Sequence, residues 1–163
     1  MLRALLDWER LSDFPRQPLW LFICGDAAYM QGRRFLRRLQ SLVPRLRKTR
    51  VIFPGHVTGI RKGAFFALAD LYVFPSRHES YGLTLVEALR AGLPAVCLDH
   101  HGAREVLRPD CGLLATKEQL REAIACLLLD ADLRARMGRA ARDYAVTLRF
   151  SDAAAALAGI IRN

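Results

Sequence analysis

The sequence lacks several motifs by which common enzyme classes are recognised. No G-x-G-x-x-G follows its first apolar run, and neither G-x-x-x-x-G-K-[ST] nor G-x-S-x-G occurs anywhere. These absences argue against a dinucleotide fingerprint, a P-loop and the nucleophile elbow of serine hydrolases. No apolar run approaches the roughly 18 residues that a membrane-spanning helix needs. The sequence therefore offers no motif for any of these four classes.

Cysteine is scarce, and the four cysteines form no C-x-x-C pair. Cys24 and Cys97 lie in apolar runs of strand length, and Cys126 lies on an apolar helix face, which predicts reduced thiols in the core. The neighbours His100 and His101 have no third metal ligand at a suitable spacing. We therefore expect no disulfide, no metal and no cofactor.

The composition is that of a globular protein, with 52% hydrophobic and 25% charged residues in a chain of 163 residues. That length is typical of one domain with a sizeable core. Asp7 and Glu9 interrupt the N-terminal apolar segment, which excludes a signal-peptide core. We expect one domain, residues 1–163, in the cytoplasm.

Basic residues are in excess, 25 against 16 acidic residues, which gives a formal charge of +9. This balance favours an anionic partner: a nucleotide, an acidic membrane surface, nucleic acid or an acidic neighbouring domain. The densest basic cluster, Arg33 to Arg50, is interpreted mainly as the solvated face of an amphipathic helix whose inner face includes Phe35. Aromatic residues are not interleaved with the arginines. A nucleic-acid-binding domain therefore ranks last, and contact with an acidic membrane stays open.

Apolar runs of strand length alternate with helical patterns and short loops along the chain. Strands are predicted at 19–24, 51–54, 71–74, 95–98 and 112–115, and helices at 1–12, 29–42, 61–69, before Gly92, at 103–107, after a Thr116/Gln119 capping box, after Asp130, and at 152–161. This alternation implies parallel β-α-β units in a doubly wound α/β sheet with a helical C-terminus. Ligands of such sheets bind beyond the carboxyl ends of the strands. The loops at those ends are 25–27, 55–57, 75–82 and 99–102.

The stretch 74–89 runs from a strand end through a polar loop into a helix. The first N–H groups of a helix lack internal partners and lie at the positive end of its dipole, so they can bind phosphate or sugar hydroxyls. Glu79 and Glu87 flank these donors, and a carboxylate can accept hydrogen bonds from two vicinal hydroxyls. Alternatively, Thr84-x-x-Glu87 matches a capping box, in which Glu87 serves only the helix. Both interpretations stay open for Glu87.

The order of residues 74–94 is F-P-S-x-x-E-S-Y-G-L-T-L-V-E-A-L-x-A-G-L-P. This order resembles the donor-binding domain of retaining GT-B glycosyltransferases of group 1 (family 4), which includes sucrose synthases and bacterial mannosyltransferases. The signature of that family is two glutamates separated by seven residues, as Glu79 and Glu87 are. The resemblance extends to V-I-F-P-G-H-V at 51–57 and to G-x-x-E-V from Gly102, and it covers about 19–163.

The resemblance implies a Rossmann-like GT-B half that binds a nucleoside diphosphate sugar. Glu87 would hold the ribose hydroxyls, and Glu79 would be the catalytic residue that contacts the sugar near its reacting face. The other binding residues that the resemblance implies are Ser80, Tyr81, Gly82, Leu83 and Thr84 around the sugar and the distal phosphate, and Gly55, His56 and Val57 against the base. The implied reaction transfers a hexose with retained anomeric configuration, in polysaccharide or glycolipid biosynthesis.

Two features of the family have no counterpart here. Its members begin this domain with a strand, an Arg and a Lys-Gly loop that neutralise the diphosphate, and this sequence starts after them. Arg61 and Lys62 are predicted in another loop and do not inherit that role. The absent strand is central in the family, so a gap is expected between the first two strands and the other three, unless the sheet closes up or another segment fills it.

The second missing feature is the N-terminal domain, which carries the acceptor site. We therefore expect a fragment of a two-domain GT-B protein that is inactive alone. The alternative is a non-catalytic or degenerate partner subunit that docks to a glycosyltransferase half.

Overall fold

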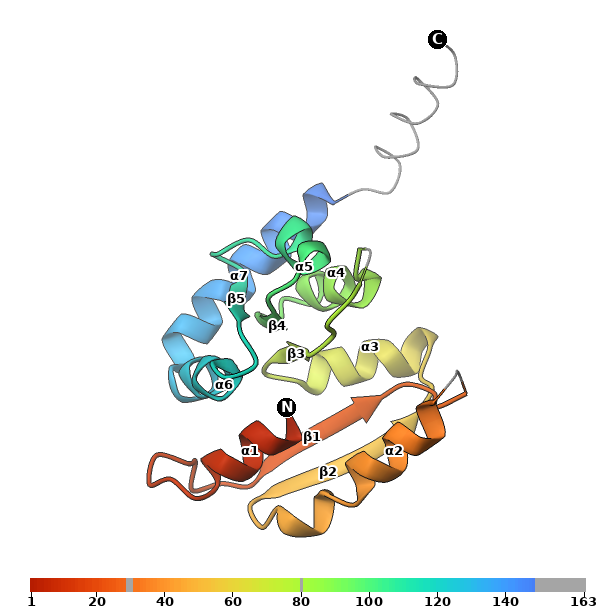
Figure 1. The fold of residues 1–163 in the computed structure, drawn as a ribbon. Helices are drawn as coiled ribbons and strands as arrows, with labels where there is room; N and C mark the ends of the chain where they lie inside the picture. The colour runs from red at the N-terminus through yellow and green to blue at the C-terminus, as the bar shows by residue number, and fades with distance from the viewer. Residues whose placement is uncertain (29–30, 80, 149–163) are drawn as a thin grey trace.

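Helices and parallel strands alternate along the chain (Figure 1), and the computed structural model describes residues 1–28, 31–79 and 81–148. The strands are β1 (Leu19–Cys24), β2 (Thr49–Gly55), β3 (Tyr72–Phe74), β4 (Ala95–Leu98) and β5 (Gly112–Ala115). The helices are α1 (Leu2–Trp8), α2 (Gly32–Gln40), the 3₁₀ turn η1 (Val43–Arg45), α3 (Gly59–Leu68), α4 (Leu83–Arg90), α5 (His101–Val106), α6 (Leu120–Leu129) and α7 (Ala131–Thr147). The predicted α/β class, the five strands and the helical C-terminal part are confirmed, while the helix predicted at 152–161 lies outside the described residues.

The strands form two separate parallel sheets in the described part of the chain. β1 pairs with β2, and β3, β4 and β5 form the second sheet in that order. The far edges of β1 and β3 have no strand partner among these residues. The gap expected from the absent central strand is therefore present, because the sheet has neither closed up nor gained another described strand.

Burial differs between the two sheets. In β4 the side chains of Ala95, Val96 and Cys97 are fully buried, as expected for a strand covered on both faces. In β1, by contrast, Trp20 is 56% exposed and Cys24 is exposed. A continuous apolar run thus predicted the position of β1 correctly but overestimated its burial.

Two other side chains that were predicted to lie inside are exposed. Cys126 is on the outer side of α6, and Phe35 on α2 is 61% exposed. Helix α2 has no buried residue at all, and its arginines form a solvated face. No helix in the described part of the chain is long and apolar enough to cross a membrane.

Two apolar clusters form the core. The first joins α1 and α6 to residues from both sheets, and Trp8 is its largest fully buried side chain. The second packs α4, α5 and α7 against β3 and β4 around Leu85 and Leu89, which are also fully buried. Gly92 ends α4 with φ +78°, a left-handed conformation that favours glycine. Helix α4, which carries Glu87, is held in place by its packing against α7 in this second cluster.

After β5 the predicted cap of Asp130 is confirmed, whereas the bonds between Thr116 and Gln119 close the turn before α6, whose N-cap residue is Gln119 and not Thr116. The Thr116 N–H donates to Oε1 of Gln119 (3.1 Å), and the Gln119 N–H donates to Oγ1 of Thr116 (3.3 Å). Asp130 accepts from the Leu133 N–H at 2.8 Å and begins α7. A polar side chain thus satisfies an amide at the start of α7 and a reciprocal pair stabilises the turn that leads into α6.

Candidate functional site

A left-handed glycine starts α4, at the carboxyl end of β3. Gly82 is the N-cap residue with φ +74° and ψ +57°, and no side chain caps the helix. A Cβ atom at this position would lie 3.3 Å from the Phe74 ring, so only glycine fits without strain. The chain therefore turns sharply, and the first turn of α4 is left open to solvent.

The free amide donors of α4 are limited to its first residues. The N–H groups of Leu85 and Val86 bond to the Gly82 carbonyl oxygen at 2.8 and 3.3 Å. The N–H groups of Leu83 and Thr84 have no partner in the described part of the chain, and both residues are exposed. The free donors of α4 are thus the N–H groups of Leu83 and Thr84, and they lie where a helix dipole favours an anion.

The Thr84 hydroxyl is oriented by a tyrosine. The Tyr72 hydroxyl donates to Oγ1 of Thr84 at 2.9 Å, and burial raises the pKa of Tyr72 to about 12. Tyr72 therefore remains a donor at neutral pH. Because Thr84 accepts this bond, its own proton is available for an acceptor on a ligand.

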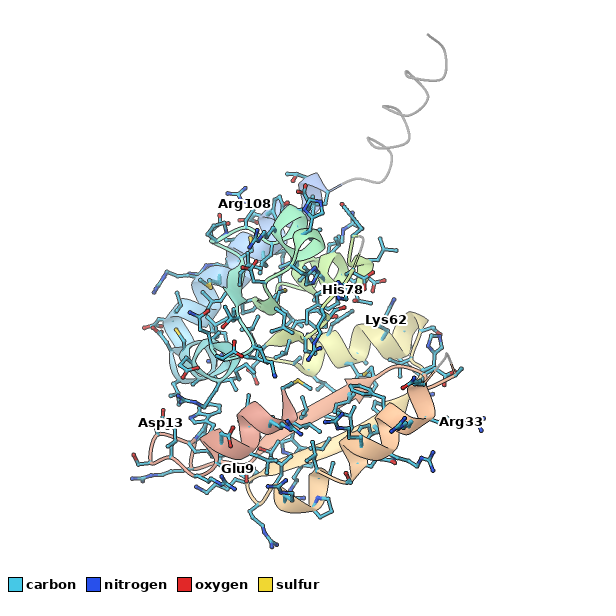
Figure 2. All side chains as sticks on the ribbon, in the orientation of Figure 1. Glu9, Asp13, Arg33, Lys62, His78 and Arg108 are labelled. Atoms are coloured by element: carbon cyan, nitrogen blue, oxygen red, sulfur yellow. The ribbon has the colours of Figure 1, made fainter. Side chains whose placement is uncertain are left out.

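Glu87 does not cap its helix. The Lys62 Nζ donates to its Oε1 at 2.6 Å, and its Oε2 is shielded from solvent without a hydrogen-bond partner among the described residues. The capping-box interpretation of Thr84 and Glu87 is therefore wrong. Lys62 is on α3, in agreement with the helix predicted at 61–69 and not with a loop, and it projects toward the side of α4 in Figure 2.

A pocket of about 390 Å³ lies between the loop after β3 and the start of α5. Its walls are Arg77, His78, Glu79, His100, His101 and Gly102. The predicted catalytic carboxylate, Glu79, is exposed and shares this pocket with one guanidinium and three imidazoles. Such a lining offers many hydrogen-bond donors and acceptors to a polyol. No group of three or more metal-binding side chains is found in the described ranges.

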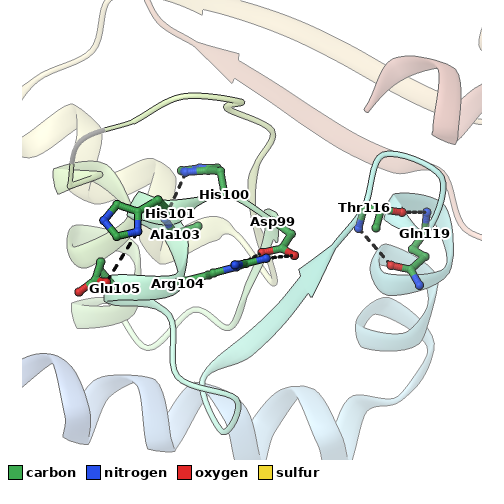
Figure 3. A network of polar contacts seen from close by, with 8 residues as sticks. All are labelled: Asp99, His100, His101, Ala103, Arg104, Glu105, Thr116 and Gln119. Carbon is green, nitrogen blue, oxygen red and sulfur yellow. Dashed lines mark hydrogen bonds and ion pairs between the residues drawn. The ribbon is translucent and has the colours of Figure 1, made fainter.

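The second wall of the pocket is held by a polar network (Figure 3). Nδ1 of His100 accepts from the Ala103 N–H at 3.3 Å, which leaves Nε2 as the protonated nitrogen of a neutral ring. Nε2 is shielded and has no acceptor among the described residues. Asp99 accepts two bonds from Arg104, at 2.6 and 2.8 Å, and these bonds hold the Asp99 pKa below its usual range.

The structure brings some of the predicted residues together and leaves others apart. Glu79 lines the pocket, whereas Glu87 lies beside α3. Gly55 ends β2, His56 follows it and Val57 is buried, so the predicted base loop leads directly into α3. Ser80 lies outside the described residues. The exposed Tyr81 is next to the α4 N-cap.

His100 and Arg77 line the pocket but were not predicted from the sequence as site residues. The one available signal for His100 was its place in the loop after β4, at a carboxyl strand end. Arg77 has the same signal within 75–82. Neither position is selected by a motif, and their meeting across the pocket depends on the packing of two loops.

Parallel strands that alternate with helices, and a helix N-terminus beyond the end of β3, define an α/β domain with an open helix end at the carboxyl side of its sheet. The family model for "Glycosyl transferases group 1" matches residues 5–144. The chain belongs to this family of glycosyltransferases.

Curated relatives agree with this assignment. The chain is 32% identical over 167 residues to the D-inositol 3-phosphate glycosyltransferase of Corynebacterium jeikeium, covering 96% of this chain and 38% of that protein. It is 32% identical over 155 residues to a GDP-mannose-dependent alpha-(1-6)-phosphatidylinositol monomannoside mannosyltransferase of Mycobacterium tuberculosis, covering 88% and 39% respectively. The chain thus spans about two-fifths of the length of these relatives.

Solved structures show the same architecture. Anabaena HepE in complex with UDP-glucose aligns with a TM-score of 0.75 and 25% identity, over 89% of this chain and 40% of that one. WaaG, a glycosyltransferase involved in lipopolysaccharide biosynthesis, aligns with a TM-score of 0.66 and 27% identity, over 90% and 38%. These neighbours are GT-B glycosyltransferases, which confirms the predicted fold class.

Proposed function

We propose that the chain is the donor-binding half of a retaining glycosyltransferase that takes a hexose from a nucleoside diphosphate sugar. The observation that carries the proposal is the open N-terminus of α4, where the N–H groups of Leu83 and Thr84 are free beside two carboxylates. An anion is favoured at this helix end. The nucleotide sugars named with structural neighbours, such as UDP-glucose, support this ligand class.

In this proposal each part of the donor has its own contacts. The distal phosphate and the sugar bind at the amides of Tyr81 to Leu83 and at the Thr84 hydroxyl. Glu87 accepts from the ribose hydroxyls, and the base lies against the loop 55–57. Glu79 reaches the sugar from the pocket that it shares with His78 and the loop after β4.

The proposal also limits what the isolated chain can do. Transfer needs an acceptor site, and the relatives contain a further three-fifths of chain that this sequence does not match. We therefore expect donor binding without transfer. If the isolated chain converted UDP-glucose, GDP-mannose or ADP-glucose to a glycoside of any added acceptor, this part of the proposal would fail.

The test is a thermal-unfolding screen with UDP-glucose, GDP-mannose and ADP-glucose, followed by calorimetry on the best ligand. A ligand at a hundred times its Kd adds about 2.7 kcal/mol to the unfolding free energy. For a domain of this size that raises Tm by on the order of 5 to 10 °C. Glu87→Gln should weaken binding at least about tenfold, because it removes charge-assisted hydrogen bonds.

The matched control is Glu118→Gln. Glu118 is exposed in the turn before α6 and forms no ion pair among the described residues, so its substitution should leave the Kd unchanged. Equal binding by wild type and Glu87→Gln would remove the ribose role. Absence of binding by all three sugars would overturn the proposal itself.

A second candidate function, a partner subunit without its own catalysis, is favoured by the split sheet. Edges of parallel strands are usually buried within a continuous sheet, and here those of β1 and β3 are unpaired among the described residues. A chain of this kind would need another polypeptide for stability. Donor binding with an affinity unchanged by Glu79→Gln and Glu87→Gln would favour this candidate over the first.

A further inference from the structure

Lys62 and Glu87 form an ion pair between two helices. Lys62 is in the first turns of α3 and Glu87 is in the middle of α4, 25 positions later, and their Nζ and Oε1 atoms are 2.6 Å apart. The side chains remain 32% and 39% exposed. A ligand that lies over the start of α4 can therefore reach the pair.

The two oxygens of Glu87 are in different states. Oε1 is occupied by the lysine, and Oε2 is shielded from solvent without a donor among the described residues. A shielded carboxylate oxygen is costly to leave unpaired. Because Oε2 has almost no exposed surface, a hydroxyl group on a ligand can supply the missing donor only when the atoms that cover Oε2 move aside. The position of the Lys62 ammonium group thus determines which oxygen of Glu87 is left for a ligand.

The pair contributes little to the fold itself. Ion pairs with this much exposure typically contribute about 0.2–1 kcal/mol to stability. Their attraction rises when a ligand excludes water, because the local dielectric constant falls. The larger effect of Lys62 is therefore expected in the liganded state, where it fixes the carboxylate in one orientation.

We propose that Lys62 is a positioning residue of the donor site, which holds Oε1 of Glu87 so that Oε2 accepts a hydrogen bond from a ribose hydroxyl. This inference rests on the proposed function, because it assigns a partner to the ribose-binding carboxylate. It adds a residue that neither the family signature nor the sequence pattern selected. Lys62 acts through Glu87 and makes no contact with the phosphates.

The test is calorimetry with whichever of UDP, GDP and ADP the wild-type chain binds most tightly, and with the matching nucleoside. Lys62→Met should weaken binding of both ligands about three- to tenfold, the effect of losing one charge-assisted hydrogen bond. Lys62→Gln should give the same loss, and Lys62→Arg should retain affinity within about twofold. The Tm of each unliganded variant is measured alongside, since an exposed pair should change it little.

The matched control is Arg61→Met. Arg61 has the same charge, neighbours Lys62 on α3, is exposed and forms no ion pair in the described part of the chain. Its substitution should leave affinity unchanged. An equal loss in Arg61→Met would mean that general charge attraction explains the effect, and the positioning role would be rejected.

A double-mutant cycle decides whether Lys62 works through Glu87. In a Glu87→Gln background, Lys62→Met should cause no further loss, measured by ligand-observed NMR. A further loss, or a loss seen with the diphosphate but not with the nucleoside, would place Lys62 on the phosphates and overturn the inference. If the wild-type chain binds none of these ligands, the proposed function fails and the inference fails with it.

Discussion

Replacing Gly138 by Ala tests the contact that fixes α4 from behind. Gly138 is buried on α7, and a Cβ atom there would lie 2.5 Å from the carbonyl oxygen of Gly92, the residue that ends α4. The obstacle is backbone and cannot rotate away. Alanine gains about 1 kcal/mol of helix propensity over glycine, whereas forcing an extra methyl group into a packed contact costs about 1–3 kcal/mol. Because the obstacle is backbone, the upper part of that range applies, about 2–3 kcal/mol, and the net destabilisation is expected to be about 1–2 kcal/mol.

Gly63→Ala is the matched substitution in α3. Gly63 is exposed, and nothing lies within 4 Å of a Cβ atom built there. The same change should therefore stabilise the protein by about 0.5–1 kcal/mol. Urea and thermal unfolding followed by circular dichroism measure both variants, and the expected Tm shifts are on the order of 2–8 °C downward for Gly138 and 1–4 °C upward for Gly63. A Gly138→Ala variant as stable as Gly63→Ala would refute the proposed packing of α7 on α4.

The remaining predictions concern the thiols and the core. Cys24 and Cys126 are exposed and should react with a thiol reagent in the native protein, whereas Cys97 and Cys111 should react only after unfolding. Burial raises the pKa of each buried thiol from 9.0 to about 12. The contribution of these two thiols to the free energy of unfolding should be fully present below pH 9 and should fall as the pH rises toward 12, because only the unfolded chain releases the thiol protons in that window. Urea midpoints that do not change over this pH window would contradict the prediction. Leu127→Ala, at a fully buried site in α6, should cost about 2–5 kcal/mol in urea unfolding, and a loss under 1 kcal/mol would contradict its core position.

The sequence predicted the positions of strands better than their surroundings. Apolar runs located β1 and β4 without error in either boundary, because a buried parallel strand needs a continuous apolar run. The same pattern assumes that both faces and both edges are covered. At β1 one edge is unpaired among the described residues, and the face that carries Trp20 and Cys24 is also left exposed. Local pattern cannot report this, because coverage depends on what packs from elsewhere.

In the candidate site too, the sequence predicted the residues of a local motif but not the residues that meet this motif through tertiary packing. Glu79, Gly82 and Glu87 were selected by a contiguous motif, and the structure places Gly82 at the start of α4, Glu87 in the middle of that helix and Glu79 in the pocket. Lys62 and His100 were not selected as site residues. Each meets the motif only through tertiary packing, Lys62 across 25 residues and His100 from the loop after β4. Contacts between elements carry no periodic signal in a single sequence.

Two similar four-residue patterns in this chain behave differently, and the difference explains why Glu87 is available to a ligand. Thr116 and Gln119 exchange the reciprocal bonds of a capping box. Thr84 and Glu87 have the same spacing, but Gly82 takes the N-cap position in a left-handed conformation, and the helix begins before the threonine. Thr84 is then the second helical residue and Glu87 the fifth, where a side chain cannot reach back to the N-cap amide. One glycine therefore converts a capping sequence into an open helix end, with a carboxylate that pairs with Lys62 instead of capping the helix.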